Sequence, residues 1–393
     1  ACSCVWLGYS AQLNDGSEQQ EVLGCGKFGK VVKCHKKGTN EHVALKVMIK
    51  GNRLSAAREA EIFKRLRRLD PDKNNIVRFY SCFKYKTCFC FEFELLDISL
   101  YDFMERREWK PLSVAEIRPI AQQMLVALTA LKSIGVTHSD IKPANILLVN
   151  QESKPFKVKL IDFGASCMTS NFTQFHEIQS FGYRAPEVYL GLRPDESVDM
   201  WGLGCTLLFL FFGQHFYPTS QCEYNYMKFI VKLHGTFTDE NGNSYDHLES
   251  LDDLQKMVPD IKDPTELGDL NAFIDLIKNM LVVDPLKRIL PADALNHKYI
   301  SMEHLNEVDK SPYRTMAKEI MSVCELSRKT DSDTDDADKE SYDSDFSLKD
   351  SRNTMNDVKL IFEEQRSTLT KTTWSSFITA FHIRTALVLR TSC

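Results

Sequence analysis

The chain lacks an apolar run long enough to cross a bilayer. Its most apolar stretch, 203–212, is far shorter than the roughly 20 residues that a spanning helix needs. It also lacks a basic excess, because 49 Lys and Arg residues face 54 Asp and Glu residues. We therefore expect neither membrane association nor direct nucleic-acid binding. No signal peptide is evident at the start, and the missing initial Met indicates a processed chain or a fragment.

Zinc-type cysteine pairs are also missing, although the chain has 12 cysteines. Cys2/Cys4 and Cys88/Cys90 are C-x-C only, whereas zinc sites usually use C-x₂-C pairs. Several of the others, such as Cys205, lie in apolar runs, so we predict reduced core residues of an intracellular protein. The 393-residue length suffices for a two-lobed domain and a tail.

What the sequence does contain is the stretch V-T-H-S-D-I-K-P-A-N-I-L-L at 136–148. Asp140 and Asn145 are separated by four residues, with Lys142 between them. The H-R-D-x-x-x-x-N loop of protein kinases has this spacing: its Asp receives the proton of the substrate hydroxyl, and its Asn holds a metal ion. The alternative is an ordinary polar loop with a turn at Pro143.

Three glycines lie between two β-rich runs in V-L-G-C-G-K-F-G-K-V-V-K-C, residues 22–34. Gly24, Gly26 and Gly29 predict a hairpin whose backbone N–H groups can approach phosphates. An unremarkable hairpin is the alternative. A dinucleotide site is disfavoured because a further strand, and no helix, follows.

That further strand, 42–48, places Lys46 in an apolar run. A buried lysine needs a partner, and the helix predicted over 58–69 offers Glu59 or Glu61. Two more strand-like runs, 79–85 and 88–93, precede a short link into the next helix.

A long helix is predicted after this link. Ser113 and Glu116 resemble a capping box ahead of a long apolar helix, which Pro119 either starts or kinks. The run 158–164 ends in D-F-G, which suits a strand that ends at a metal-binding carboxylate. Residues 165–184 would then be the activation segment before A-P-E.

With these motifs in one order, residues 21–300 resemble eukaryotic protein kinases. Four segments are similar to the homeodomain-interacting protein kinases, which group with the dual-specificity tyrosine-regulated kinases: 33–46, 93–103, 117–123 and 183–192. The likeness continues through 295–305 and fades near residue 325. The resemblance implies an α+β, bilobal protein kinase fold with a small β-rich N-lobe and a larger helical C-lobe.

The resemblance also implies roles for individual residues. Asp140 would be the catalytic base, Lys142 would contact the transferred phosphate, and Asn145 and Asp162 would bind Mg²⁺. ATP would be held by ten residues of the N-lobe and the link to the C-lobe: Leu23, Gly24, Gly26, Gly29, Val31, Ala44, Lys46, Glu59, Glu94 and Leu96. Lys46 would pair with Glu59, and Glu187 of A-P-E with Arg288.

Three positions depart from the family pattern. Ser139 replaces the usual arginine of the catalytic loop, which we interpret as a regulatory difference. Glu177 falls at the activation-segment tyrosine, so its fixed charge could substitute for phosphotyrosine; sequence drift is the alternative. Gly182 replaces a usual tyrosine, which puts the substrate preference in doubt. Arg184 matches the arginine that shapes a pocket for proline after the target residue.

The expected organisation is a lead-in segment (1–20), a kinase domain (N-lobe 21–96, C-lobe 97–305), a C-terminal extension (306–325) and an acidic, disordered tail (326–393). The implied function is a proline-directed serine/threonine kinase that uses ATP and Mg²⁺. Protein substrates and, by family resemblance, transcription regulators are the expected partners. Nuclear localisation also comes from the resemblance, with the cytoplasm as the alternative. The alternative function is a catalytically silent kinase-fold scaffold.

Overall fold

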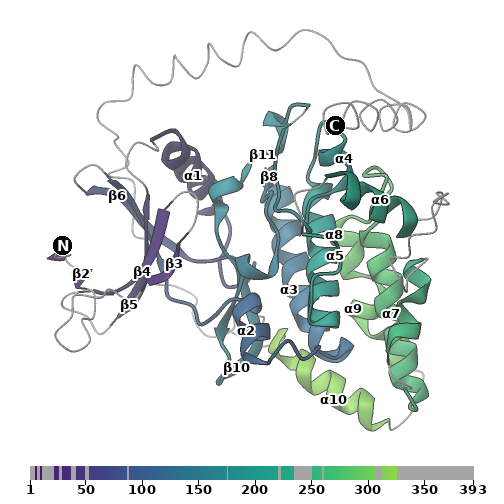
Figure 1. Ribbon diagram of the computed structural model, residues 1–393. Helices are drawn as coiled ribbons and strands as arrows, with labels where there is room; N and C mark the ends of the chain where they lie inside the picture. Colours follow the sequence, from purple (N-terminus) through teal and green to yellow (C-terminus); the bar gives the residue numbers. More distant parts are fainter. Residues whose placement is uncertain are drawn as a thin grey trace. The chain divides into compact units, whose positions relative to one another are not determined.

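The computed structural model describes residues 5–6, 9–10, 22–25, 29–36, 41–48, 53–85, 88–174, 176–219, 223–233, 250–258, 261–306 and 311–324 (Figure 1). The acidic tail predicted at 326–393 and Gly26 of the glycine-rich hairpin lie outside these residues.

The N-terminal part is an antiparallel sheet in the order β1-β2-β4-β5-β7-β6, with β3 paired to β4. Val, Phe and Tyr residues favour these extended segments. The strands are β1 (Val5–Trp6), β2 (Tyr9–Ser10), β3 (Val22–Cys25), β4 (Gly29–Lys36), β5 (His42–Met48), β6 (Phe79–Tyr85) and β7 (Cys88–Glu94).

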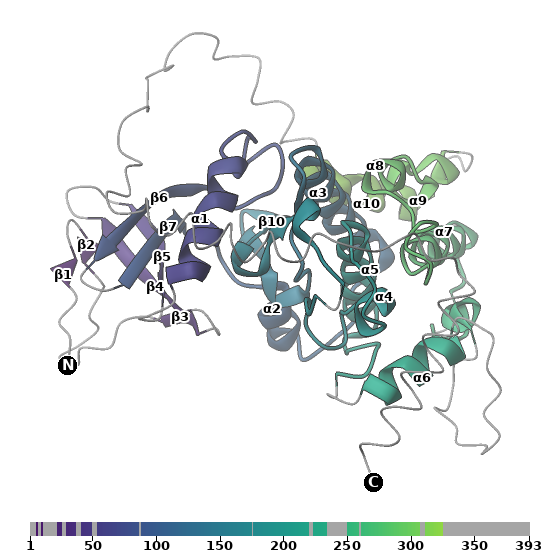
Figure 2. The same cartoon turned by 90° about the horizontal axis from the view of Figure 1, so that it is seen from above.

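One helix, α1 (Arg53–Leu66), packs against this sheet in both views (Figures 1 and 2). The Phe63 ring stacks on Phe79 at 4.6 Å between centroids and lies 5.1 Å from Phe93. The predicted start at Arg58 was wrong, because the helix-forming Ala56 and its neighbours extend it by more than a turn.

The C-terminal part is mainly helical, and the predicted bilobal α+β fold is confirmed. Figures 1 and 2 show α3 and α5 side by side at its centre. Its helices are α2 (Leu100–Arg106), α3 (Val114–Ser133), α4 (Pro186–Tyr189), α5 (Ser197–Phe212), α6 (Glu223–Leu233), α7 (Pro264–Met280), α8 (Pro291–Leu295), α9 (Lys298–Ser301) and α10 (Pro312–Met321). Four short strands accompany them: β8 (Val136–Thr137), β9 (Ile146–Asn150), β10 (Lys154–Leu160) and β11 (Cys167–Met168).

The long helix α3 begins as the capping-box prediction requires. The Ser113 hydroxyl accepts the Glu116 N–H, and the Glu116 carboxylate accepts the Ser113 N–H at 2.8 Å. Pro119 lies inside the helix, so the alternative in which it starts the helix was wrong. Pro119 removes one backbone hydrogen bond near the start of this 20-residue helix, and the remaining turns and the many buried side chains sustain it.

The predicted pair of Glu187 and Arg288 is confirmed. Arg288 donates to both carboxylate oxygens of Glu187, at 2.7 and 2.9 Å, and both side chains are buried. The pair ties α4, at the end of the activation segment, to the loop after α7. It therefore fixes the A-P-E end of the activation segment.

A second buried ion pair anchors the C-terminal extension. Arg118 of α3 donates to both carboxylate oxygens of Asp269 on α7, and both side chains are fully buried. Asp269 also accepts the Tyr313 hydroxyl of α10 at 2.7 Å and contacts His304 Nε2 at 2.9 Å. Burial alone would raise the pKa of Asp269, but the hydrogen bond of His304 and the charge of Arg118 lower it. This cluster joins three helices through one carboxylate.

The described residues show two negative findings. No described helix has the length and apolar character to cross a membrane. Among the cysteines in the described part of the chain, Cys90 and Cys205, for example, are buried and form no disulfide.

Candidate active site

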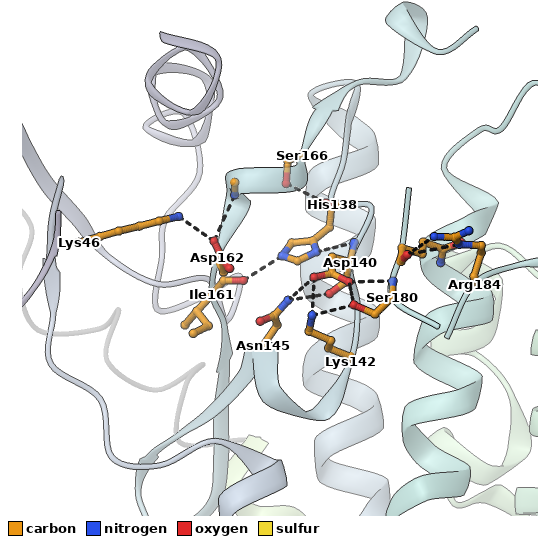
Figure 3. Close-up of polar contacts among 12 residues, drawn as sticks. Lys46, His138, Asp140, Lys142, Asn145, Ile161, Asp162, Ser166, Ser180 and Arg184 are labelled. Atoms are coloured by element: carbon orange, nitrogen blue, oxygen red, sulfur yellow. Dashed lines mark hydrogen bonds and ion pairs between the residues drawn. The ribbon is translucent and has the colours of Figure 1, made fainter. Parts of the chain in front are cut away.

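The loop between β8 and β9 carries three of the predicted residues. Lys142 Nζ donates to a carboxylate oxygen of Asp140 at 2.7 Å (Figure 3). Asn145 Nδ2 donates to the same oxygen at 3.2 Å and to the Asp140 carbonyl at 2.8 Å. A 3₁₀ turn over Pro143–Asn145 brings the amide back over Asp140. The sequence spacing thus becomes one polar cluster.

Buried groups hold this loop in place. Asp199 of α5 accepts the backbone N–H groups of His138 at 2.7 Å and Ser139 at 2.8 Å. Burial raises the pKa of Asp199 to about 6, although both N–H donors oppose that rise. Asp140 N–H donates to His138 Nδ1, so Nε2 carries the ring proton and donates to Ile161 O at 2.9 Å (Figure 3). His138 therefore joins the loop to the residue before Asp162.

Lys46 of β5 bridges two carboxylates. Its Nζ donates to Glu59 of α1 at 2.7 Å and to Asp162 at 2.8 Å. The predicted choice of Glu59 as partner is confirmed: Glu59 is 1% exposed, whereas Glu61 is exposed and lies beside Arg65. Lys46 therefore connects strand β5 of the sheet to Asp162 of the D-F-G motif.

These contacts keep Lys46 and Asp162 charged. Burial alone would lower the pKa of Lys46, but the carboxylates of Asp162 and Glu59 outweigh it and raise the pKa. Burial would raise the pKa of Asp162, but the charge of Lys46 outweighs it and lowers the pKa. An ammonium and a carboxylate therefore face each other across the site at neutral pH.

Asn145 and Asp162 offer oxygen atoms suited to a hard divalent cation. The Asn145 Nδ2 faces Asp140, and its Oδ1 accepts no hydrogen bond from a described residue. The Asp162 backbone is left-handed, with φ 59°. The Gly164 N–H donates a hydrogen bond to the Asp162 carboxylate and supports this conformation. Within the described ranges, no cluster of three or more His, Cys, Asp or Glu side chains could hold a metal alone. Phosphate and water oxygens would have to complete the coordination, as is usual for Mg²⁺.

Residues predicted to line ATP lie on three adjacent strands. Leu23 and Gly24 are on β3, Val31 is on β4 and Ala44 is on β5. The strand register pairs Gly24 with Val31. Leu23 is 44% exposed, so an apolar side chain at this edge is left for a ligand to cover.

The link between the two parts of the fold offers backbone groups. One oxygen of the Glu94 carboxylate, Oε1, accepts both the Arg78 N–H at 2.5 Å and the Lys159 ammonium at 2.6 Å, so this side chain already has partners within the protein. The Leu96 N–H donates to no described residue. A buried N–H group needs a partner, and adenine nitrogen is a suitable acceptor.

Two of the three predicted glycines differ in the space available for a side chain. A Cβ on Gly29 would lie 2.3 Å from the Val47 carbonyl oxygen, whereas a Cβ on Gly24 would meet nothing within 4 Å. Gly29→Ala should therefore cost about 1–3 kcal/mol of stability. Gly24→Ala should change stability by less than about 0.5 kcal/mol and raise the KM for ATP, because the added methyl group would occupy open space beside a backbone that is predicted to approach the phosphates.

Thermal melts and ATP titrations of the two variants check this prediction, and each variant is the control for the other. If Gly24→Ala leaves the KM for ATP unchanged, Gly24 does not cradle phosphates.

One functional candidate, Ser180, was missed by the sequence reasoning. Its N–H and hydroxyl donate to one carboxylate oxygen of Asp140, at 3.1 and 2.8 Å, and its hydroxyl accepts from Lys142 at 2.8 Å (Figure 3). A lone serine in the activation segment carries no local signal. Its partners lie about 40 residues away in sequence, so only the fold reveals it.

The three departures from the family pattern have distinct surroundings. Ser139 is buried with φ 68°, and its carbonyl accepts the Gln179 N–H at 3.0 Å. Gly182 has φ 79°, and a Cβ there would lie 3.0 Å from Thr219 Cγ2, so an L side chain would be strained. Glu177 is exposed and pairs with no described residue.

Comparison with known proteins identifies the family. The family model described as "Protein kinase domain" matches residues 17–300. The chain is 37% identical over 355 residues to homeodomain-interacting protein kinase 2 of Mesocricetus auratus, covering 78% of this chain and 30% of that protein. It is 36% identical over 363 residues to homeodomain-interacting protein kinase 1 of Caenorhabditis elegans, covering 78% and 43%. It is 32% identical over 348 residues to homeodomain-interacting protein kinase 4 of Homo sapiens, covering 75% and 56%.

The chain thus spans between about a third and somewhat more than half of these relatives. The match to the family model extends from the lead-in segment to α9 and contains the whole site around Asp140. This chain belongs to the protein kinase family, and its sequence is similar to those of the homeodomain-interacting protein kinases.

Proposed function

We propose that this protein kinase transfers the γ-phosphate of ATP to serine or threonine residues of proteins. The observation that carries the proposal is the joint placement of two ion pairs. Lys142 pairs with Asp140 at 2.7 Å, and Lys46 pairs with Asp162 at 2.8 Å. His138 connects the two through its bonds to Asp140 N–H and Ile161 O. This is the apparatus that phosphoryl transfer needs: a base beside cations.

Each residue then has a defined task. The Asp140 carboxylate accepts the proton of the substrate hydroxyl, and Lys142 and Ser180 hold that carboxylate in place. Lys142 also lies where it can neutralise charge on the transferred group. Lys46, fixed by Glu59, binds the phosphates that remain with the nucleotide. Catalysis by such a site comes from positioning and electrostatic stabilisation.

Asn145 and Asp162 would hold Mg²⁺, which neutralises phosphate charge when it is bound. Two observations support this assignment: the Asn145 amide oxygen accepts no hydrogen bond from a described residue, and the Asp162 carboxylate is ionised. Glu94 and Leu96 would present backbone groups to the adenine, since the Glu94 side chain is occupied.

Serine or threonine is favoured over tyrosine as the acceptor. The Lys142–Ser180 bridge draws the activation segment close to Asp140, which favours a short acceptor side chain. Proline direction is supported by Arg184, which lies beside the left-handed backbone of Gln179 (φ 66°) and donates to its carbonyl at 3.1 Å.

We further propose that the protein acts in the nucleus on transcription regulators. The relatives are named for interaction with homeodomains, and this assignment rests on that similarity alone. A catalytically silent scaffold is the alternative function. It is disfavoured because Lys46, Asp140 and Asp162 are all present and in contact with partners.

A phosphate-transfer assay tests the function. Transfer from ATP should be measured to a Ser-Pro peptide, to the same peptide with Ala in place of Pro, and to one with Tyr in place of Ser. We expect transfer to the first peptide above both controls. ATP that raises the melting temperature without any transfer would favour the scaffold instead.

A further inference from the structure

Arg184 is a nearly buried cation whose direct contacts among the described residues are uncharged. The residue is 8% exposed. Its Nε and Nη2 donate to the backbone carbonyl of Gln179, at 3.4 and 3.1 Å, and it has no carboxylate partner among the described residues. A charge removed from water needs compensation, so something other than an anion must stabilise this guanidinium.

Two aromatic rings supply that compensation. The Arg184 Cζ lies 4.7 Å from the centroid of Phe181 and 5.2 Å from the centroid of Tyr189. The ring faces carry negative electrostatic potential, and their attraction for a cation grows when water is excluded. Two aromatic rings and a carbonyl oxygen therefore stabilise the Arg184 guanidinium in place of a carboxylate.

The carbonyl that Arg184 binds belongs to a residue which shapes the activation segment. The Gln179 side chain donates to Tyr183 O at 3.1 Å and to Val198 O at 2.9 Å, and it accepts Ala185 N–H at 2.9 Å. Its backbone is left-handed, an unfavourable conformation that requires such support.

The next residue, Ser180, makes the two bonds to Asp140 (Figure 3). The contacts therefore form a continuous series. The Phe181 ring contacts Arg184, Arg184 binds the Gln179 carbonyl, and Ser180, the residue after Gln179, binds the catalytic carboxylate. Figure 3 shows Arg184 beside the segment that carries Ser180.

We propose that Phe181 is a positioning residue that fixes Arg184, and through it the segment around Ser180, without any negative charge on the activation segment. Glu177, which is exposed and unpaired among the described residues, takes no part. The kinase would then be active without phosphorylation of this segment and without a charge that imitates it. The proposal rests on the proposed function and concerns the regulation of the same site.

The test compares three variants with the wild type. Phe181→Leu keeps an apolar side chain but removes the ring, Phe181→Tyr keeps the ring, and Glu177→Gln removes the charge. The readouts are kcat and KM for the Ser-Pro peptide, KM for ATP, and Tm. Wild-type protein treated with a phosphatase is assayed alongside.

We expect Phe181→Leu to lower kcat/KM for the peptide by about 3- to 30-fold, the range of one desolvated cation–π contact. Its KM for ATP should stay near the wild-type value and its Tm should fall by only a few degrees, whereas a general loss of structure would change both strongly. Phe181→Tyr, Glu177→Gln and the phosphatase-treated protein should keep wild-type kcat/KM.

Other outcomes overturn the proposal. Unchanged activity in Phe181→Leu would show that the ring does not position the segment, and an equal loss in Phe181→Tyr would show that the ring face is irrelevant. A loss in Glu177→Gln or after phosphatase treatment would restore the need for a charge. A wild type that transfers no phosphate would refute the proposed function itself, and this proposal with it.

Discussion

Asp140→Asn is expected to lower kcat for phosphate transfer by about 10²- to 10⁴-fold, the usual contribution of a positioned general base. The carboxylate accepts hydrogen bonds from Lys142, Asn145 and the N–H and hydroxyl of Ser180. An amide has one acceptor oxygen and cannot take the proton of a substrate hydroxyl. Lys46 and Asp162 do not contact Asp140, so nucleotide binding should survive.

The measurement is a steady-state assay combined with the rise in Tm that ATP and Mg²⁺ produce. Saturation at about 100 times the Kd should stabilise both proteins by about 2.7 kcal/mol. Asp293→Asn, at an exposed carboxylate on α8, is the matched control and should keep wild-type kcat. If Asp140→Asn retains kcat within a few-fold of wild type, Asp140 is not the base.

Local patterns predicted the parts of the site that lie close together in sequence. Asp140, Lys142 and Asn145 share one short loop, so their spacing already determines which atoms can meet. The capping box of Ser113 and Glu116 was readable for the same reason. The fold class followed from the family resemblance, which the order of such motifs supports.

Contacts between distant segments were not readable in this way. Ser180 reaches Asp140 across 40 residues, and Asp199 reaches the N–H groups of His138 and Ser139 across about 60. The local sequence marks Asp199 only as part of the start of an apolar helix and does not mark Ser180 at all, so neither contact could be predicted. Lys46 with Glu59 was different: a lysine in an apolar strand requires a partner, and family resemblance selected one of two glutamates.

Glycine function was only partly readable. All three glycines of 24–29 looked alike in sequence, yet Gly29 is required by the close approach of Val47 on the neighbouring strand. Gly24 has open space around its Cα. The motif therefore contains a position that the fold requires to be glycine and a position that it does not, and the space around each Cα separates them.

Asp269→Asn is expected to lower the free energy of unfolding by about 3–5 kcal/mol at neutral pH, because it leaves the Arg118 charge buried without a counter-ion. The carboxylate accepts from Arg118 and from the Tyr313 hydroxyl, and it contacts His304. An amide cannot satisfy all of these groups. Since Tyr313 is on α10, limited proteolysis should also cut the C-terminal extension earlier in the variant.

The pH dependence of this loss follows from the pKa of Asp269, which is lowered in the folded protein. A lowered folded pKa adds stability above the ordinary value of about 4, and that stability disappears as pH falls through the folded pKa. The gap between wild type and Asp269→Asn in urea titrations should therefore narrow in acid. Asp275→Asn, on the same helix but half-exposed beside Lys298, should cost less than about 1 kcal/mol. Equal losses in the two variants would mean that burial of the Arg118 pair does not determine the effect.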